Sequence, residues 1–231
     1  MKKRIKIHGF IIFLAVIIII SFPKIFLRDA PAVFPEDLLT VLGIASVLLG
    51  QIFRLSSRGF KSELSKNGFA LVESGPYAFV RNPMYLGIIL IGLGLVLMLF
   101  KWWAICIFFV FFALIYLNLI FQEEKKLIQA FPGAYEAYRK KVPAIIPTFK
   151  MVVKTEMSAY LPLKLPWIKR EVGSISGVLA FATIIKCWES LRGGGYLLCV
   201  QRFVVILLMI TLSMGLAAYL IKKTDELAKS V

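Results

Sequence analysis

Two apolar segments separated by a single charged residue decide the fold. Residues 83–100 read PMYLGIILIGLGLVLMLF, residues 102–121 read WWAICIFFVFFALIYLNLIF, and Lys101 lies between them. A helix needs about 20 apolar residues to cross the hydrocarbon of a membrane, and so short a connection makes consecutive helices antiparallel neighbours. We therefore expect a helical hairpin whose two free ends, near residues 82 and 122, lie at the same face of the membrane.

Four further apolar segments are candidate spans: 9–27, 38–55, 175–191 and 203–221. The segment 175–191 is the weakest of them, and a helix there could instead lie flat on the membrane. The 231-residue chain is 59% hydrophobic and 18% charged, whereas soluble domains are about half apolar and a quarter charged. The sequence predicts an all-α, polytopic integral membrane helical bundle.

The charge distribution predicts the orientation of this bundle. The net charge is +15, and 22 of the 28 lysines and arginines fall in the two termini and in segments 54–82 and 122–177. Because positive loops stay in the cytoplasm, we expect both termini and both ends of the hairpin to be cytoplasmic, in a bacterial-type inner membrane. The basic residues flank apolar segments, which favours anionic lipid headgroups as partners over nucleic acid.

The residue types that bind metals are scarce and scattered. Three cysteines, Cys106, Cys187 and Cys199, lie far apart, and the single histidine is His8. We therefore expect no metal site, since zinc sites gather several cysteine or histidine ligands at short spacing. No feature of the sequence points to an obligate protein partner.

Polar residues gather at the two ends of the hairpin. Arg81 and Asn82 precede the first segment, and Glu123 and Glu124 follow the second. Charged groups at a membrane boundary are costly unless they are solvated, paired or used. Taken singly, each has a structural explanation: Asn82 is placed to cap a helix that begins at Pro83, and the two glutamates can be a solvated helix end.

Motifs across residues 70–147 resemble the isoprenylcysteine carboxyl methyltransferase family, which is related to the membrane phospholipid N-methyltransferases. In order they are Gly-Pro-Tyr from residue 75, Arg-Asn-Pro-Met-Tyr-Leu-Gly from residue 81, Glu123-Glu124, and Tyr-x-x-Tyr-x-x-x-Val-Pro-x-x-x-Pro from residue 135. Many members of the family have histidine where this chain has Asn82, and asparagine cannot act as a base.

The resemblance implies S-adenosylmethionine as methyl donor, in a pocket at the cytoplasmic face of the helices. It implies a central methyltransferase-like region, residues 61–150, between an N-terminal helix pair, 1–60, and a C-terminal extension, 151–231. Gly92 and Gly94 resemble a glycine motif that binds the cofactor in phospholipid enzymes, although small residues in membrane helices usually mean close helix packing. The implied catalytic residues are Arg81, Asn82, Tyr85 and Glu124, and the implied cofactor-binding residues are Tyr77, Arg81, Asn82, Tyr85, Gly92, Gly94, Glu123, Glu124, Tyr135 and Tyr138.

The expected function is therefore methyl transfer to a lipidic or apolar acceptor that enters from the bilayer. A carboxylate acceptor needs no base, whereas an amine must lose a proton, and the sequence leaves both open. Two alternatives remain. Sterol-reductase-like membrane enzymes that use NADPH share an Arg-x-Pro-x-Tyr stretch, and a non-catalytic scaffold or transporter could retain the same architecture.

Overall fold

The structure, a computed structural model, describes residues 21–28, 36–65, 70–147, 160–193 and 195–229, and these are helical apart from loops and one isolated bridge between Leu27 and Phe100. The predicted span 9–27 lies mostly outside the described residues. In chain order the helices are α2 (Pro23–Phe26), α3 (Glu36–Leu64), α4 (Pro76–Phe79), α5 (Pro83–Leu99), α6 (Trp103–Phe112), the π-helical turn η1 (Ala113–Leu117), α7 (Asn118–Ala130), α8 (Ala134–Lys141), α11 (Leu165–Gly193) and α12 (Gly195–Lys229).

Three helices of the described part are long and apolar enough to cross a membrane: Leu38–Leu64, the continuous Trp103–Ala130, and Phe203–Glu226. The apolar α5 is shorter, at 17 residues. An all-α polytopic membrane bundle is thereby confirmed. The helix α11 begins ten residues before the predicted segment 175–191 and is not among the three.

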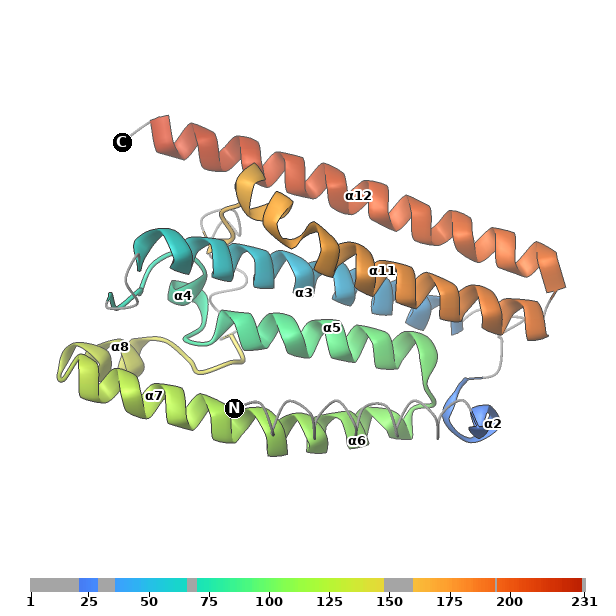
Figure 1. Cartoon of the computed structure of the whole chain (residues 1–231), viewed down its shortest axis with the longest axis horizontal. Coiled ribbons are helices and arrows are strands. Elements are labelled where there is room, and N and C mark those ends of the chain that lie inside the picture. Colours follow the sequence, from blue (N-terminus) through green and yellow to red (C-terminus); the bar gives the residue numbers. More distant parts are fainter. Residues whose placement is uncertain (1–20, 29–35, 66–69, 148–159, 194, 230–231) are drawn as a thin grey trace.

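The helices are arranged so that the two ends of the predicted hairpin lie together. α5 leads through the turn at Lys101 into α6, η1 and α7, which run back antiparallel to it (Figure 1). The small helices α4 and α8 lie at the same end of the bundle as the start of α5, and the C-terminal end of α12 points the same way (Figure 1). The hairpin that the sequence predicts therefore accounts for the return of α7 to the end where α5 begins.

The helix that α5 packs against most closely is α3, which precedes it in the sequence. A β-carbon added to Gly94 would lie 2.4 Å from the carbonyl oxygen of Gly43, and one added to Gly87 would lie 2.7 Å from that of Gly50. Only glycine allows two helix backbones to approach so closely. Gly94 thus serves helix packing, as do Gly43, Gly50 and Gly87.

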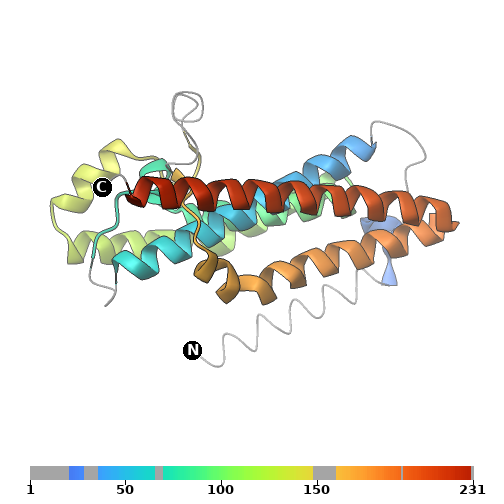
Figure 2. The same cartoon turned by 90° about the horizontal axis from the view of Figure 1, so that it is seen from above.

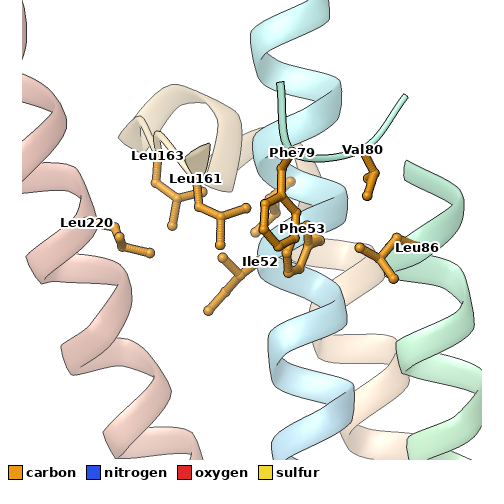
Figure 3. Close-up of a cluster of buried hydrophobic side chains, with 9 residues drawn as sticks. Ile52, Phe53, Phe79, Val80, Leu86, Leu161, Leu163 and Leu220 are labelled. Atoms are coloured by element: carbon orange, nitrogen blue, oxygen red, sulfur yellow. The ribbon is translucent and has the colours of Figure 1, made fainter. Parts of the chain in front are cut away.

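The main apolar core lies beside the C-terminal half of α3. Phe53 of α3 stacks on Phe79 of α4, with ring centroids 5.7 Å apart, and Val80 is fully buried. Figure 3 shows side chains from α3, α5, α12 and the loop before α11 meeting in this cluster, which contains Ile52, Phe53, Leu55, Phe79, Val80, Leu86, Leu161, Leu163 and Leu220. Burial of Phe79 and Val80 anchors the chain immediately before Arg81.

The C-terminal helices α11 and α12 pack on each other and on the outer face of α3 (Figures 1 and 2). Specific hydrogen bonds attach them near the C-terminal end of α3. The indole nitrogen of Trp167 donates to Glu63 at 2.8 Å, and the amide of Leu163 donates to the hydroxyl of Thr224 at 3.1 Å. α3 itself runs past residue 60, so one helix joins the predicted N-terminal pair to the central region.

Candidate active site

The position of Arg81 and Asn82 is set by two backbone hydrogen bonds. The amide of Arg81 donates to the carbonyl of Pro143 at 2.8 Å, and the amide of Asn82 donates to that of Ala144 at 3.0 Å. These bonds tie the start of α5 to the loop after α8, two segments about 60 residues apart in the sequence. The Val-Pro stretch of the motif therefore has a structural role: it fixes the backbone at the polar end of the hairpin.

Glu124 is the centre of the site. Its side chain is 7% exposed, and its Oε1 lies 3.3 Å from Nη2 of Arg81, whose side chain is 9% exposed. The same oxygen accepts a hydrogen bond from Nδ2 of Asn82 at 3.3 Å. A buried carboxylate is stable only when paired and hydrogen-bonded, and Glu124 meets both conditions through residues some 40 positions away.

The side chain of Asn82 does not cap the helix, contrary to the expectation from sequence. Asn82 occupies the N-cap position and Pro83 follows it as the first helical residue, but no side-chain cap hydrogen bond forms. The amide nitrogen instead donates to Glu124 and to the carbonyl of Ala144, at 3.2 Å for the second. A hydrogen bond to a charged carboxylate is stronger than one between neutral groups. The contact with Glu124 is therefore favoured over a cap hydrogen bond to a helix amide.

Glu123 faces a different group of residues from its neighbour. Its Oε1 accepts a hydrogen bond from the hydroxyl of Tyr85 at 2.9 Å. The ring of Tyr85 meets the edge of Tyr116, with centroids 5.7 Å apart, and Tyr116 stacks on Phe112 at 4.6 Å. Tyr116 belongs to the π-helical turn η1, a feature often found near functional sites.

Two tyrosines of α8 close the site from outside the membrane-spanning segments. The hydroxyl of Tyr138 donates to the carbonyl of Tyr77 at 2.6 Å, and burial, followed by the charge of Glu123, raises the pKa of Tyr77 above its usual range. Burial, with the nearby charge of Glu124 as the next cause, raises the pKa of Tyr135 to about 12. Both tyrosines of α8 are buried, and they support the site as neutral hydrogen-bonding groups.

A polar cavity of about 360 Å³ opens beside this network. Its volume lies in the range of small-molecule sites. Five residues predicted from the sequence line it: Tyr77, Arg81, Asn82, Tyr85 and Glu123. Among the described residues, Nε and Nη1 of Arg81 are buried and have no hydrogen-bond partner, so the protein leaves two donors of this cavity-lining side chain unused.

Sequence reasoning missed the contribution of α3 to this cavity. Arg58, Lys61, Ser62 and Ser65 also line it. The first three lie on the part of α3 that extends past the predicted segment 38–55, and Ser65 follows its last residue. Their spacing of three and four is the signal of a shared helix face. Together with Arg81 they make the cavity wall predominantly cationic.

A second cavity, an apolar groove of about 320 Å³, lies on the other side of the contact between Tyr85 and Tyr116. It runs between α5 and the α6–η1 segment and is lined by Ile88, Ile91, Gly92, Phe108 and Tyr116, among others, with Arg54 at its wall. Tyr116 of the groove touches Tyr85 of the polar cavity. The two cavities are therefore neighbours, one polar and one apolar.

The glycines of α5 lie away from the polar cavity. Gly92 lines the apolar groove, where an added β-carbon would lie 2.4 Å from the ring of Phe108, and Gly94 packs against α3. The structure thus brings Tyr77, Arg81, Asn82, Tyr85, Glu123, Glu124, Tyr135 and Tyr138 together at one end of the bundle and leaves Gly92 and Gly94 deeper along α5. The described residues contain no group of three or more histidine, cysteine, aspartate or glutamate side chains that could hold a metal.

Comparison with known proteins adds independent information. The family model of the phospholipid methyltransferases matches residues 37–134. Protein-S-isoprenylcysteine O-methyltransferase of Schizosaccharomyces pombe is 30% identical over 139 residues, which is 58% of each chain. The protein of the same name from Saccharomyces cerevisiae is 30% identical over 156 residues, 63% of this chain and 64% of the relative.

A third relative carries a different name. The cobalt-zinc-cadmium resistance protein CzcN of Cupriavidus metallidurans is 34% identical over 116 residues, 50% of this chain and 52% of that protein. The matches therefore span between about half and two thirds of the length of these relatives. No solved structure matches the chain at a comparable level of significance. The comparisons confirm the resemblance read from the motifs, and the helices α11 and α12 lie beyond the matched family model.

Proposed function

We propose that this chain, whose central part resembles the isoprenylcysteine carboxyl methyltransferases, is a membrane-embedded methyltransferase that uses S-adenosylmethionine and acts on a lipidic or apolar acceptor. One observation carries the proposal. A buried network of Arg81, Asn82 and Glu124 borders a polar cavity, and that cavity adjoins an apolar groove between membrane-spanning helices. Such a pair of cavities suits one polar and one apolar reactant.

The residues of the polar cavity fit the proposed methyl donor. Arg81 has two buried N–H donors without a partner in the described part of the chain, and a guanidinium suits a carboxylate. Glu123 can accept hydrogen bonds from an ammonium or hydroxyl group, and the aromatic ring of Tyr77 can face a cation. When bound, S-adenosylmethionine supplies an electrophilic methyl group.

The chain would contribute alignment and exclusion of water instead of proton transfer. The ion pair of Glu124 with Arg81 and the hydrogen bond that Glu124 accepts from Asn82 hold those side chains before any ligand binds, and preorganised polar groups need no rearrangement during reaction. Asn82 has no titratable group, and a carboxylate acceptor requires no base. The catalytic role of Arg81, Asn82, Tyr85 and Glu124 is therefore proposed as binding and positioning.

The apolar groove supports an acceptor with a hydrocarbon part. Its described lining is almost entirely aliphatic and aromatic, and it lies within helices that are suited to a membrane. Its lining residue Tyr116 contacts Tyr85 of the polar cavity, so a reactive head at the end of the groove would lie next to a donor in the cavity. The charge distribution favours a cytoplasmic site, both termini in the cytoplasm and contact with anionic headgroups.

The test is ligand binding by the purified full-length chain in detergent micelles. We expect saturable binding of radiolabelled S-adenosylmethionine and none of NADPH. Binding of NADPH alone would contradict the proposal and favour a reductase, for which the cationic wall formed by Arg58, Lys61 and Arg81 is the supporting feature.

Variants of Arg81 locate the binding site. Arg81→Ala should abolish binding of S-adenosylmethionine, whereas Arg139→Ala, which removes an exposed arginine from α8, should leave it unchanged. Because Arg81→Ala leaves Glu124 buried without its cation, Arg81→Lys serves as a second variant. It keeps the charge but loses the planar fork of donors, and we expect a folded protein that binds at least about tenfold more weakly. Equal affinity in Arg81→Lys and the wild type would remove Arg81 from the site.

A further inference from the structure

One side of the apolar groove comes from outside the matched family model. Val178, in α11, lines the groove together with residues of α5 and of the α6–η1 segment. The family model matches residues 37–134, so this side of the groove is an addition to the matched part of the chain. A residue of the C-terminal extension therefore shapes a cavity whose other walls belong to the methyltransferase-like region.

The face of α11 that carries Val178 is held against α3. A β-carbon added to Gly59 of α3 would overlap the indole ring of Trp167, so that ring packs on the backbone of α3. One turn farther along α11, Oε1 of Glu171 lies 2.6 Å from Nη1 of Arg58. Residues four and seven apart lie on one side of a helix, so the attachments at Trp167 and Glu171 orient Val178 toward the groove.

Val178 marks the end of the groove that is far from the polar cavity. At the near end, Tyr116 contacts Tyr85 of the polar cavity. Val178 instead packs against the apolar cluster that contains Met98, in the last turn of α5. Pro83, the first residue of α5, lines the polar cavity, and Met98 lies about 22 Å farther along that helix.

The groove is short compared with the membrane. Along the α6–η1 segment its lining extends from Phe108 to Tyr116, a rise of about 12 Å, whereas the hydrocarbon core of a bilayer is about 30 Å thick. At the far end the ring of Phe108 lies directly on the backbone of Gly92, since a β-carbon there would be 2.4 Å from the ring. A hydrocarbon chain that follows the groove from Tyr116 must therefore end, or turn out toward lipid, near Val178.

We propose that Val178 is a specificity-determining residue that limits the length of the acceptor's hydrocarbon chain. This inference rests on the proposed function and narrows its acceptor to an amphiphile whose chain ends beside α11. A valine suits this role because its branched side chain is stiff and has few rotamers. An apolar pocket discriminates between ligands that differ by a methylene by about tenfold or more, so a small change of volume at this position has a measurable effect.

The experiment uses three probes with the same head and different chains. Each is an N-acetylcysteine that carries a geranyl, a farnesyl or a geranylgeranyl group on sulfur, so successive probes differ by one isoprene unit. Their affinities for the purified full-length chain are measured by displacement of the radiolabelled farnesyl probe in one detergent. Each affinity is divided by that of the wild type for the same probe, because partition of the probe into the micelle then cancels.

Two variants of Val178 should act in opposite directions. Val178→Phe places a larger ring at the far end and should weaken the geranylgeranyl probe at least about tenfold more than the geranyl probe. Val178→Ala opens this end and should favour the longest probe several-fold, and it tests the proposal without adding bulk. Binding of S-adenosylmethionine should be unchanged in both, since Val178 lies away from the polar cavity.

The matched control is Val172→Phe, the same substitution on the exposed side of α11. Val172 is 50% exposed and does not belong to the described lining of the groove. This variant should change neither the binding of any probe nor that of S-adenosylmethionine. A change of chain-length preference in Val172→Phe equal to that in Val178→Phe would overturn the assignment to Val178.

The remaining outcomes separate this inference from the proposed function. Absence of S-adenosylmethionine binding in the wild type would contradict the proposed function itself. Binding of S-adenosylmethionine together with equal changes for all three probes in both Val178 variants would overturn only the role of Val178, which would then be a packing residue. Binding of S-adenosylmethionine by a wild-type chain that binds none of the probes would also overturn this inference.

Discussion

The helix pairs α3–α5 and α11–α12 use glycine in opposite ways. In the first pair, β-carbons added to Gly43 and Gly50 would lie 2.7 and 2.6 Å from carbonyl oxygens of α5, so the two backbones touch. In the second pair, β-carbons added to Gly173, Gly177 and Gly215 would meet nothing within 4 Å. The first pair has one permitted spacing, whereas the second has room to adapt.

This difference matches the positions of the two cavities. Both cavities are lined by residues of α3 and α5, so the close-packed pair fixes their geometry. The pair α11–α12 exposes many apolar side chains, including Phe181, Leu208 and Leu212, as expected of helices that face lipid. Near the start of α11 it is attached through contacts such as those of Trp167 and Glu171, and farther along α11 Val178 lines the apolar groove.

The largest effect should come from cutting that attachment. Trp167 is 4% exposed and hydrogen-bonds Glu63. Trp167→Ala should lower the free energy of unfolding by about 3–5 kcal/mol, the usual cost of removing a buried tryptophan. Circular dichroism during thermal unfolding in micelles measures this change.

The matched control for Trp167 is Trp102→Ala, because Trp102 is 75% exposed. It should change the stability by no more than about 0.5 kcal/mol. Equal small effects in the two variants would mean that α11 and α12 are not bound to α3 through Trp167.

A smaller effect should distinguish the glycines of the two pairs. Gly94→Ala forces a methyl group against the backbone of Gly43, which cannot rotate away, and should cost about 1–3 kcal/mol. Gly215→Ala, where the added group meets open space, should instead stabilise α12 by up to about 1 kcal/mol through its higher helix propensity. The same unfolding experiment tests both, and a stable Gly94→Ala protein would show that α3 and α5 can separate freely.

The smallest effect should come from a single polar contact of the close-packed part. Tyr85→Phe removes the hydrogen bond to Glu123 and should cost about 1 kcal/mol, since Glu123 is exposed to solvent. Tyr116→Phe keeps the ring contact with Tyr85 and is the control, with an expected change below about 0.5 kcal/mol. A larger loss of stability for Tyr116→Phe than for Tyr85→Phe would contradict the expectation that the hydrogen bond between Tyr85 and Glu123 is the stabilising contact.

Much of the fold was predictable because it follows from length and polarity. The two long apolar segments with a one-residue connection determine the hairpin, and the hairpin brings the segments that carry Arg81 and Glu124 to the same end of the bundle. The position of Pro83 at the start of α5 also followed from its missing N–H. These predictions need only the rise of a helix and the thickness of a membrane.

The parts that could not be predicted depend on tertiary contacts. Asn82 has the sequence context of a capping residue, but its amide turns to Glu124, which only the folded chain brings near. The choice of α3 as the closest partner of α5 depends on glycines that face each other across two helices. The pairing of Arg54 with Glu171 joins residues 117 positions apart, and no local pattern signals such a pair.

The π-helical turn at Ala113–Leu117 sets the rotational phase of everything after it. Such a turn accommodates one residue more than an α-helical turn of the same rise, and each residue rotates a helix by about 100°. A regular α-helix from Trp103 onward would therefore carry the acidic pair about a quarter turn around the axis, away from the start of α5. The π-helical turn accommodates one extra residue between the turn at Lys101 and the two glutamates. The glutamates face the start of α5 only because of it.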